Sequence, residues 1–296
     1  RKQKDEVEFL FKHALAQQAT YESIMEKTRK DLHLKIAVSI EKVFETRINE
    51  FYGTLAHHYG KAGKMDKTKE YLIEAGEESM KSGASSEAVS FFKQALELFD
   101  QTESKQNQQK IIDLEEKLAY ALAVTGQCIE SIEYCEKLIA HYYKPLPKSD
   151  FRRFMDLVVN IALLYRITFF RKYNNESKSN EVNRKLLKIL VLESNATAYV
   201  DPKRLFFNSP YGARFLKKNQ FGKDEAIIMM TSGTVFLHTG ILINLGKRLI
   251  EWGKTFIDEK YVLGWIRGKF CVAMLDYDVG KKVDISDEEK VVKYAI

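Results

Sequence analysis

One stretch, residues 55–95, constrains the fold of this chain more than any other. Small, apolar and aromatic residues recur there at helical spacing on both sides of two glycines, Gly63 and Gly83. Glycine readily takes the left-handed conformation that ends a helix, and small side chains let neighbouring helix axes approach to about 8–10 Å. The pattern therefore predicts stacked antiparallel helices. The residues expected to pack at their crossings are Leu55, Ala56, Tyr59, Leu72, Ala75, Ala88, Phe92 and Ala95.

A third unit of the same kind is centred on Gly126, with Leu138 on its second helix and Pro145 beyond the helix end. The three units resemble tetratricopeptide repeats, which have a period of about 34 residues. Gly63 and Gly83 lie closer together than that, so either the middle helix serves two units or the array is a tighter variant. The resemblance implies an all-α solenoid of helical hairpins, whose curved surface suits protein binding.

The composition is that of a globular chain: 296 residues, 45% hydrophobic, with a net charge of +6. Its three cysteines, Cys128, Cys135 and Cys271, form no disulfide framework and lack the spacing of zinc ligands. This predicts a reducing compartment, the cytoplasm, with a cilium or another cytoskeletal assembly as further settings. No signal peptide and no run of about 18 apolar residues is present, so no membrane span is expected. Because the sequence starts at Arg1 without a methionine and ends in an expected helix, we expect a fragment of a larger protein.

The N-terminal part carries a second resemblance. Its phrase FKHALAQQATY is followed by a basic helix that contains TRKDLH, and then by the repeats. Over roughly residues 8–140 this order is similar to a junction in a family of large signalling ATPases, in which a nucleotide-binding module ends in a winged-helix-like segment. The junction residues that carry the match are Phe11, His13, Tyr21, Arg29 and His33.

Many members of that family carry class III adenylate or guanylate cyclase domains, as soluble-type adenylyl cyclases do. The resemblance therefore implies a small winged-helix-like element at residues 1–45. It implies ATP and Mg as cofactors of the parent protein, with none in this chain. It also implies that Phe11, Leu15 and Tyr21 are buried, and that Leu32 and Ile36 seat the next helix beneath them.

The expected organisation has three parts: the junction element at 1–45, the repeats at 46–145, and further degenerate helical repeats at 146–296. The last part contains the stretch 201–223, whose two prolines, two glycines and six Lys or Arg residues predict a basic-aromatic loop. Such a loop can bind phosphate, acidic protein or nucleic acid; alternatively its rings anchor it and its lysines keep it soluble. Its candidate interaction residues are Lys203, Arg204, Arg214, Lys217 and Lys218.

The sequence lacks recognisable catalytic and metal-binding patterns. The GKT at 253–255 resembles the end of a phosphate loop, but the first glycine of such a loop is replaced by Arg248. His57 and His58 are adjacent and project about 100° apart on a helix, so they do not readily share a metal. We therefore predict no catalytic, cofactor-binding or metal-binding residue in the chain itself.

The expected function is that of a non-catalytic helical-repeat scaffold. It would be a regulatory region of a multidomain signalling ATPase or nucleotide cyclase that binds protein partners or other domains of its own chain. A stand-alone tetratricopeptide adaptor within a large assembly is one alternative. A helical domain that binds nucleic acid through residues 201–223 is the other.

Overall fold

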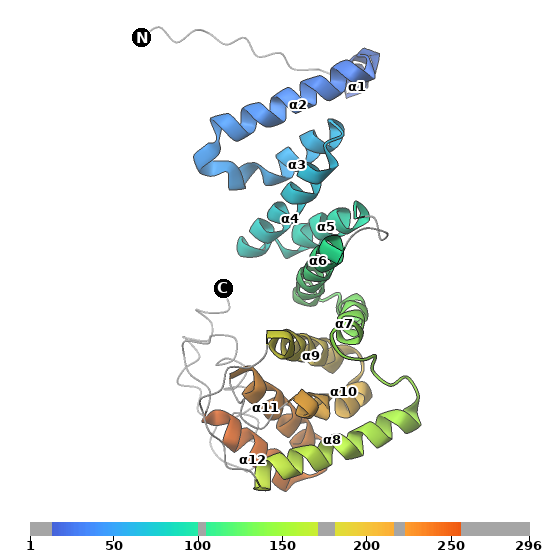
Figure 1. Ribbon diagram of the computed structural model, residues 1–296, viewed down its shortest axis with the longest axis vertical. Helices are drawn as coiled ribbons and strands as arrows, with labels where there is room; N and C mark the ends of the chain where they lie inside the picture. The colour runs from blue at the N-terminus through green and yellow to red at the C-terminus, as the bar shows by residue number, and fades with distance from the viewer. Residues whose placement is uncertain (1–13, 100–104, 171–180, 216–222, 256–296) are drawn as a thin grey trace. The chain divides into compact units, whose positions relative to one another are not determined.

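The computed structural model describes residues 14–99, 105–170, 181–215 and 223–255 (Figure 1). Every regular element in these ranges is a helix, and they contain no strand, which confirms the all-α prediction. The contacts between Cα atoms divide the chain into two compact units, residues 1–114 and 115–296. This division differs from the boundaries near residues 45 and 145 that the sequence predicted. Each unit is described by itself below.

The first unit consists of a short helix, a long helix and a series of hairpin helices. Its elements are α1 (Ala14–Ser23), α2 (Glu26–Val43), the 3-10 helix η1 (Glu45–Phe51), α3 (Tyr52–Lys61), α4 (Met65–Lys81), α5 (Ser85–Glu97) and the first part of α6 (Lys105–Val124). Each of α2, α3 and α4 packs on the helix that follows it, as the blue-to-teal part of Figure 1 shows.

The crossing of α4 and α5 explains why small residues recur in this unit. A Cβ atom on Gly76 would lie 2.3 Å from the ring of Phe92, which is only 1% exposed. On α5, Ala88 and Ala95 are completely buried. Glycine and alanine at these positions therefore let the two helix backbones approach closely around one large aromatic side chain.

The N-terminal helices differ from the expected junction element. Leu15 and Tyr21, predicted to be buried, are exposed, Leu15 to 81%. Leu32 and Ile36 are exposed as well. The reason lies in the geometry of α2: its buried residue is Ala37, and Leu32 and Ile36 lie about 100–140° around the helix axis from it.

The second unit contains the remaining helices. Its elements are the second part of α6, α7 (Cys128–Tyr142), α8 (Asp150–Phe170), α9 (Glu181–Val200), α10 (Pro202–Asn208), the 3-10 helix η2 (Ser209–Phe215), α11 (Lys223–His238) and α12 (Ile243–Lys254). Helix α7 packs on α9, α8 packs on η2, and α11 packs on α12.

The α11–α12 hairpin is held at nearly backbone-to-backbone distance. A Cβ atom on Gly233 would lie 2.8 Å from the carbonyl oxygen of Gly246, and a Cβ on Gly246 would lie 2.7 Å from that of Gly233. The core around this hairpin also includes Leu164 of α8 and Phe236 of α11, both completely buried. Gly233 and Gly246 thus allow the close packing of α11 on α12.

Residues 202–215 are helical, which corrects the predicted loop. Asp201 caps α10, since its side-chain oxygen accepts a hydrogen bond from the Arg204 backbone N–H at 3.0 Å. Pro202 occupies the first turn of α10, where the missing N–H of proline costs nothing. Tyr211 and Phe215 of η2 are buried. Prolines and aromatic residues that suggested a loop are therefore a helix start and part of a core.

One turn recurs three times in the described backbone. After α3, α4 and α6, the glycines Gly63, Gly83 and Gly126 have φ values of 74°, 82° and 78°. Each glycine N–H donates to the carbonyl three residues earlier, and the next N–H donates to the carbonyl five residues earlier. These paired bonds define the Schellman motif. The residue five positions after each glycine is buried and small; these residues are Thr68, Ala88 and Ser131.

Candidate functional site

A cluster of ring side chains joins the N-terminal helices of the first unit. Nδ1 of His33 lies 2.8 Å from Nδ1 of His58, and Nε2 of His33 lies 2.9 Å from the hydroxyl oxygen of Tyr21. The ring of His57 meets that of His33 edge-on, and the guanidinium of Arg29 lies 5.1 Å from the centre of the Tyr21 ring. The structure thus gathers three of the predicted junction residues around the adjacent histidines of α3.

The protonation state of this histidine cluster is restricted by its geometry. A hydrogen bond between two Nδ1 atoms needs one donor and one acceptor, so His33 and His58 cannot both carry a second proton. Burial lowers the pKa of both rings below 6.5, and the nearby positive charges of Lys61 and Arg29 lower that of His33 further. The cluster is therefore built for neutral rings. Within the described residues, no group of three His, Cys, Asp or Glu side chains could hold a metal ion.

A second polar contact ties α2 to the hairpin that follows it. Glu41 accepts hydrogen bonds from the hydroxyls of Tyr59, at 2.8 Å, and Tyr71. Burial, reinforced by this carboxylate, raises the pKa of Tyr59 to about 12. Both phenols therefore remain hydrogen-bond donors at physiological pH, and the contact positions α2 on α3 and α4.

The outer side of α2 is apolar although it is exposed. Met25, at the N-cap of the helix, and Leu32, Ile36 and Val43 lie within about 40° of one another around the helix axis. Their exposed fractions run from 42% to 76%. We call these four residues the α2 stripe. A helix with apolar residues both toward its neighbour and away from it is typical of a helix that contacts a further surface.

In the second unit, a buried carboxylate organises the side chains of α7, α9 and α10. Glu193 is completely buried; it accepts a hydrogen bond from Asn208 at 2.9 Å, and Arg204 lies 3.4 Å away. Arg204 also pairs with Glu136. Burial raises the pKa of Glu193, which shows that desolvation outweighs its neighbours. The guanidinium of Arg204 is therefore used inside the fold.

Of the other basic residues of the predicted loop, Arg214 and Lys203 lie in the described part of the chain and contact side chains of their own unit. Arg214 donates to Asn160 at 2.6 Å and to Asp156 at 2.7 Å. Lys203 is exposed and lies 3.9 Å from Asp150. Lys217 and Lys218 lie outside the described residues, as do Phe11 and His13 of the junction. Arg204 and Arg214 are thus both held by carboxylate and amide side chains of their own unit.

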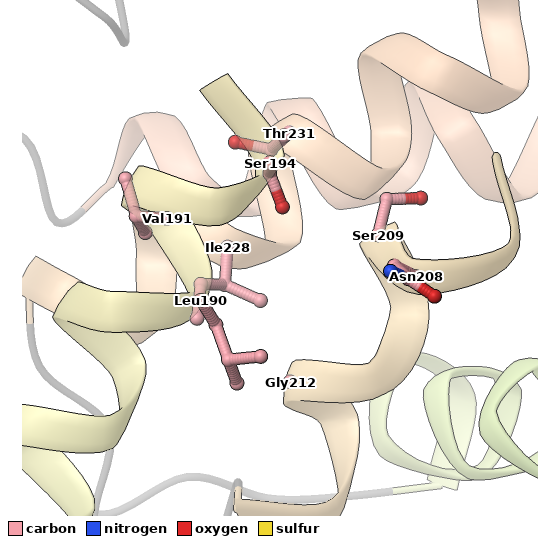
Figure 2. A pocket seen from close by; sticks show the side chains of 8 residues that line it. All are labelled: Leu190, Val191, Ser194, Asn208, Ser209, Gly212, Ile228 and Thr231. Atoms are coloured by element: carbon pink, nitrogen blue, oxygen red, sulfur yellow. The ribbon is translucent and has the colours of Figure 1, made fainter. Parts of the chain in front are cut away.

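A small hollow lies between α9, η2 and α11. Figure 2 shows Leu190, Val191, Ser194, Asn208, Ser209, Gly212, Ile228 and Thr231 around it. Its volume is about 10 Å³, enough for about one water molecule. The hydroxyl oxygen of Ser209 is buried without a hydrogen-bond partner, so a water there would be well placed. The hollow has room for solvent and not for a substrate.

Residues 253–255 lie at the end of α12 and not in a strand-to-helix loop. Gly253 is buried, and a Cβ atom there would lie 2.2 Å from the side chain of Met230. This glycine therefore serves helix packing.

Two features of these sites had only weak signals in the sequence. Glu193 is an acid within the apolar run LLKILVLES, which marks it as an unusual core position. The histidine cluster brings together residues of α1, α2 and α3 that are up to 37 positions apart, and only the structure shows that Tyr21 and His58 flank the same ring. The packing residues that the sequence predicted, the turn glycines apart, are all buried; they are Leu55, Ala56, Tyr59, Leu72, Ala75, Ala88, Phe92, Ala95 and Leu138.

Comparison with known proteins does not place the chain in a family. No protein-family model matches it, and no curated protein matches it at a significant level. Among the helices of the described residues, none is both long and apolar enough to cross a membrane. The function must therefore be argued from the geometry above.

Proposed function

We propose that this chain is a non-catalytic, tetratricopeptide-like helical-repeat region that acts by binding another protein or another domain of its own polypeptide. The observation that carries the proposal is the α2 stripe, four exposed apolar side chains aligned on one side of a helix. The recurrent glycine turns at Gly63, Gly83 and Gly126 support it, because stacked helical hairpins give extended surfaces suited to protein binding.

The charges beside the α2 stripe favour a protein surface with acidic residues. Lys35 and Lys42 are exposed and lie about 80–100° around the axis from the centre of the stripe. Interfaces commonly combine an apolar centre with a polar rim. A partner that covers the stripe would meet these two ammonium groups at its edge.

The parent protein that we propose is a signalling ATPase or nucleotide cyclase. This part rests on the resemblance at the junction, where Arg29 and His33 belong to the matching phrase. His33 of the histidine cluster lies on the same helix as the α2 stripe, so a preceding module that packs on α2 would contact the stripe beside this histidine. A stand-alone adaptor would use the same surface for a separate protein.

Site-specific photo-crosslinking tests the proposal. A photoreactive amino acid is placed at Ile36, in the stripe, or at Ile129, an exposed apolar control on α7. Both variants are made in the full-length protein and irradiated in its native cells. We expect crosslinks from position 36 to one defined protein or domain, and fewer from position 129. Crosslinks within the parent would favour the regulatory region; crosslinks to a separate protein would favour the adaptor. Equal, unspecific crosslinking at both positions would contradict the proposal.

A further inference from the structure

Helix α8, in the second unit, is apolar on two opposite sides. Its inner side carries the buried residues Leu157, Leu164 and Ile167, together with Asn160. Its outer side carries a second apolar row, which is exposed. We call this row the α8 seam; its members are Phe151, Met155, Val158, Ala162, Tyr165 and Phe169. The seam is a surface separate from the α2 stripe and does not depend on the function proposed above.

The spacing of the α8 seam is that of a coiled-coil helix. Successive members are separated by four, three, four, three and four residues, which is the alternation of the a and d positions of a heptad. From Phe151 to Phe169 the seam extends about 27 Å along the helix. Such regular spacing over five steps is what a partner helix needs for side-by-side packing.

The seam is partly organised before any partner binds. The rings of Tyr165 and Phe169 stack at 4.5 Å with their planes 8° apart. The guanidinium of Arg248, on α12, lies 4.2 Å from the centre of the Phe169 ring. Aromatic and arginine side chains dominate the energetics of many interfaces, and ordered ones lose less entropy on binding.

Among the described residues, the charged side chains that border the seam are arginines. If the seam supplies the a and d positions, Arg152 and Arg166 occupy e positions, next to the seam on one side. Neither guanidinium has a carboxylate within ion-pair distance among the described residues, and Arg248 adds a third positive charge at the end of the seam. The opposite border is uncharged: it carries Phe154, Ile161 and Thr168.

These charges argue against a second copy of this chain as the occupant. In an antiparallel pair, e positions face e positions, so arginine would face arginine. In a parallel pair, e positions face g positions, and Arg152 and Arg166 would face the uncharged border that holds Ile161. Neither pairing supplies a carboxylate. A membrane surface requires only an apolar face with no particular spacing, so the regular four–three alternation of the seam favours a helical partner.

We propose that the α8 seam docks an amphipathic helix of another protein, with apolar residues at heptad spacing and Glu or Asp residues opposite Arg152 and Arg166. The apolar residues would pack against the seam, and the acidic residues would pair with the arginines and set the orientation of the partner.

Two synthetic four-heptad peptides serve as probes. Both have Leu at the a and d positions; one has Glu at e and g, the other has Lys there. Binding of the labelled peptides to the 296-residue chain is followed by fluorescence anisotropy. We expect the Glu peptide to bind about tenfold more tightly than the Lys peptide, since exposed ion pairs contribute modestly each and add along a seam.

Three variants locate the binding, and circular dichroism checks that each is folded. Val158→Asp with Tyr165→Asp should abolish binding of the Glu peptide. Arg152→Glu with Arg166→Glu should reverse the preference in favour of the Lys peptide. The control Ile129→Asp replaces an exposed apolar residue on α7 and should leave binding unchanged.

Four outcomes would overturn the proposal. The first is equal binding of both peptides, or a preference that the arginine reversal does not change. The second is sedimentation that shows self-association of the wild-type chain that is lost in the variant with Val158→Asp and Tyr165→Asp, which would make a second copy the occupant. The third is Val158-dependent binding to phosphatidylserine vesicles without peptide binding. The fourth is peptide binding that Val158→Asp with Tyr165→Asp does not weaken, which would place the peptide elsewhere on the chain.

Discussion

At the scale of single residues, the described part of the chain places several ionisable groups in surroundings that oppose their charged forms. The histidine cluster holds two rings in a bond that requires a neutral partner, and Glu193 is buried on α9. Such groups make stability depend on pH, because the folded and unfolded chains bind protons differently. The stability of the first unit should therefore fall in mild acid. The stability of the second unit should depend on the ionisation of one carboxyl group, that of Glu193.

The histidine cluster predicts lower stability in mild acid. The pKa values of His33 and His58 are lowered in the folded protein, so below about pH 6.5 the unfolded chain binds more protons than the folded one. Stability should therefore be complete above pH 6.5 and fall as the pH decreases through the folded-state values. The measurement is the urea midpoint of unfolding between pH 7.5 and 5. The variant His58→Asn keeps a polar group near Nδ1 but does not titrate, so its midpoint should fall less. Identical pH profiles for the two proteins would rule out this role.

Glu193 predicts a change of the opposite sign. Its pKa is raised above 4.5 by burial, so the stability of the wild-type protein should fall as the pH rises from 4.5 through the folded-state pKa. Glu193→Gln keeps the shape and removes the titration. The stability of this variant relative to wild type should therefore increase between pH 4.5 and 8, as measured by urea unfolding. A difference that stays constant over this range would show that Arg204 and Asn208 compensate the buried charge.

At the scale of helices, substitution by alanine distinguishes a glycine that is needed at a helix crossing from one that has room for a methyl group. At Gly76, a methyl group would overlap the buried ring of Phe92, and overpacking of this kind costs about 1–3 kcal/mol. At Gly60, in α3, it would lie 3.5 Å from Thr68, an ordinary contact. There the better helix propensity of alanine should stabilise by up to about 1 kcal/mol. Urea unfolding of Gly76→Ala and Gly60→Ala should thus give opposite signs, and a gain at both positions would contradict the α4–α5 crossing described here.

The sequence predicted an all-helical chain, and the described residues confirm it. Its helical periodicity placed Ala88 among the residues that pack between helices, and this side chain is completely buried. The prediction was wrong where tertiary contacts decide. Residues 202–215 have the composition of a loop, yet an Asp201 cap and a buried Tyr211 make them helical. The prediction that Leu15 is buried was also wrong. Helical periodicity indicates which residues share a face of a helix, but it does not indicate whether another element covers that face.

The candidate sites were likewise hard to predict, because the sequence does not reveal tertiary contacts. The basic residues at 201–223 suggested a ligand surface, but charge composition does not reveal that Arg204 and Arg214 have carboxylate partners in their own unit. Conversely, the heptad spacing on α8 is present in the sequence, and it became informative only once the opposite side of that helix was known to be packed.

At the scale of the whole chain, we predict binding without turnover. The 296-residue protein should hydrolyse no ATP and form no cyclic nucleotide, because residues 253–255, which resemble the end of a phosphate loop in the sequence, lie at the end of a packed helix. The measurement is phosphate release and cyclic-nucleotide formation with Mg·ATP and Mg·GTP, with a catalytically competent cyclase as the positive control. Turnover that copurifies with the chain and disappears on substitution of one of its residues would contradict this prediction.

The central structural claim is that one helix–turn–helix geometry recurs at Gly63, Gly83 and Gly126. At all three glycines φ is positive, and a Cβ atom would meet nothing within 4 Å, so substitution by alanine isolates the cost of the backbone conformation. The most direct measurement is the free energy of unfolding of the three separate Gly→Ala variants, with Gly60→Ala as the helical control. The account predicts a loss of about 1–2 kcal/mol at each of the three turns and no loss at Gly60. A cost at only one turn, or none at any, would contradict the repeat.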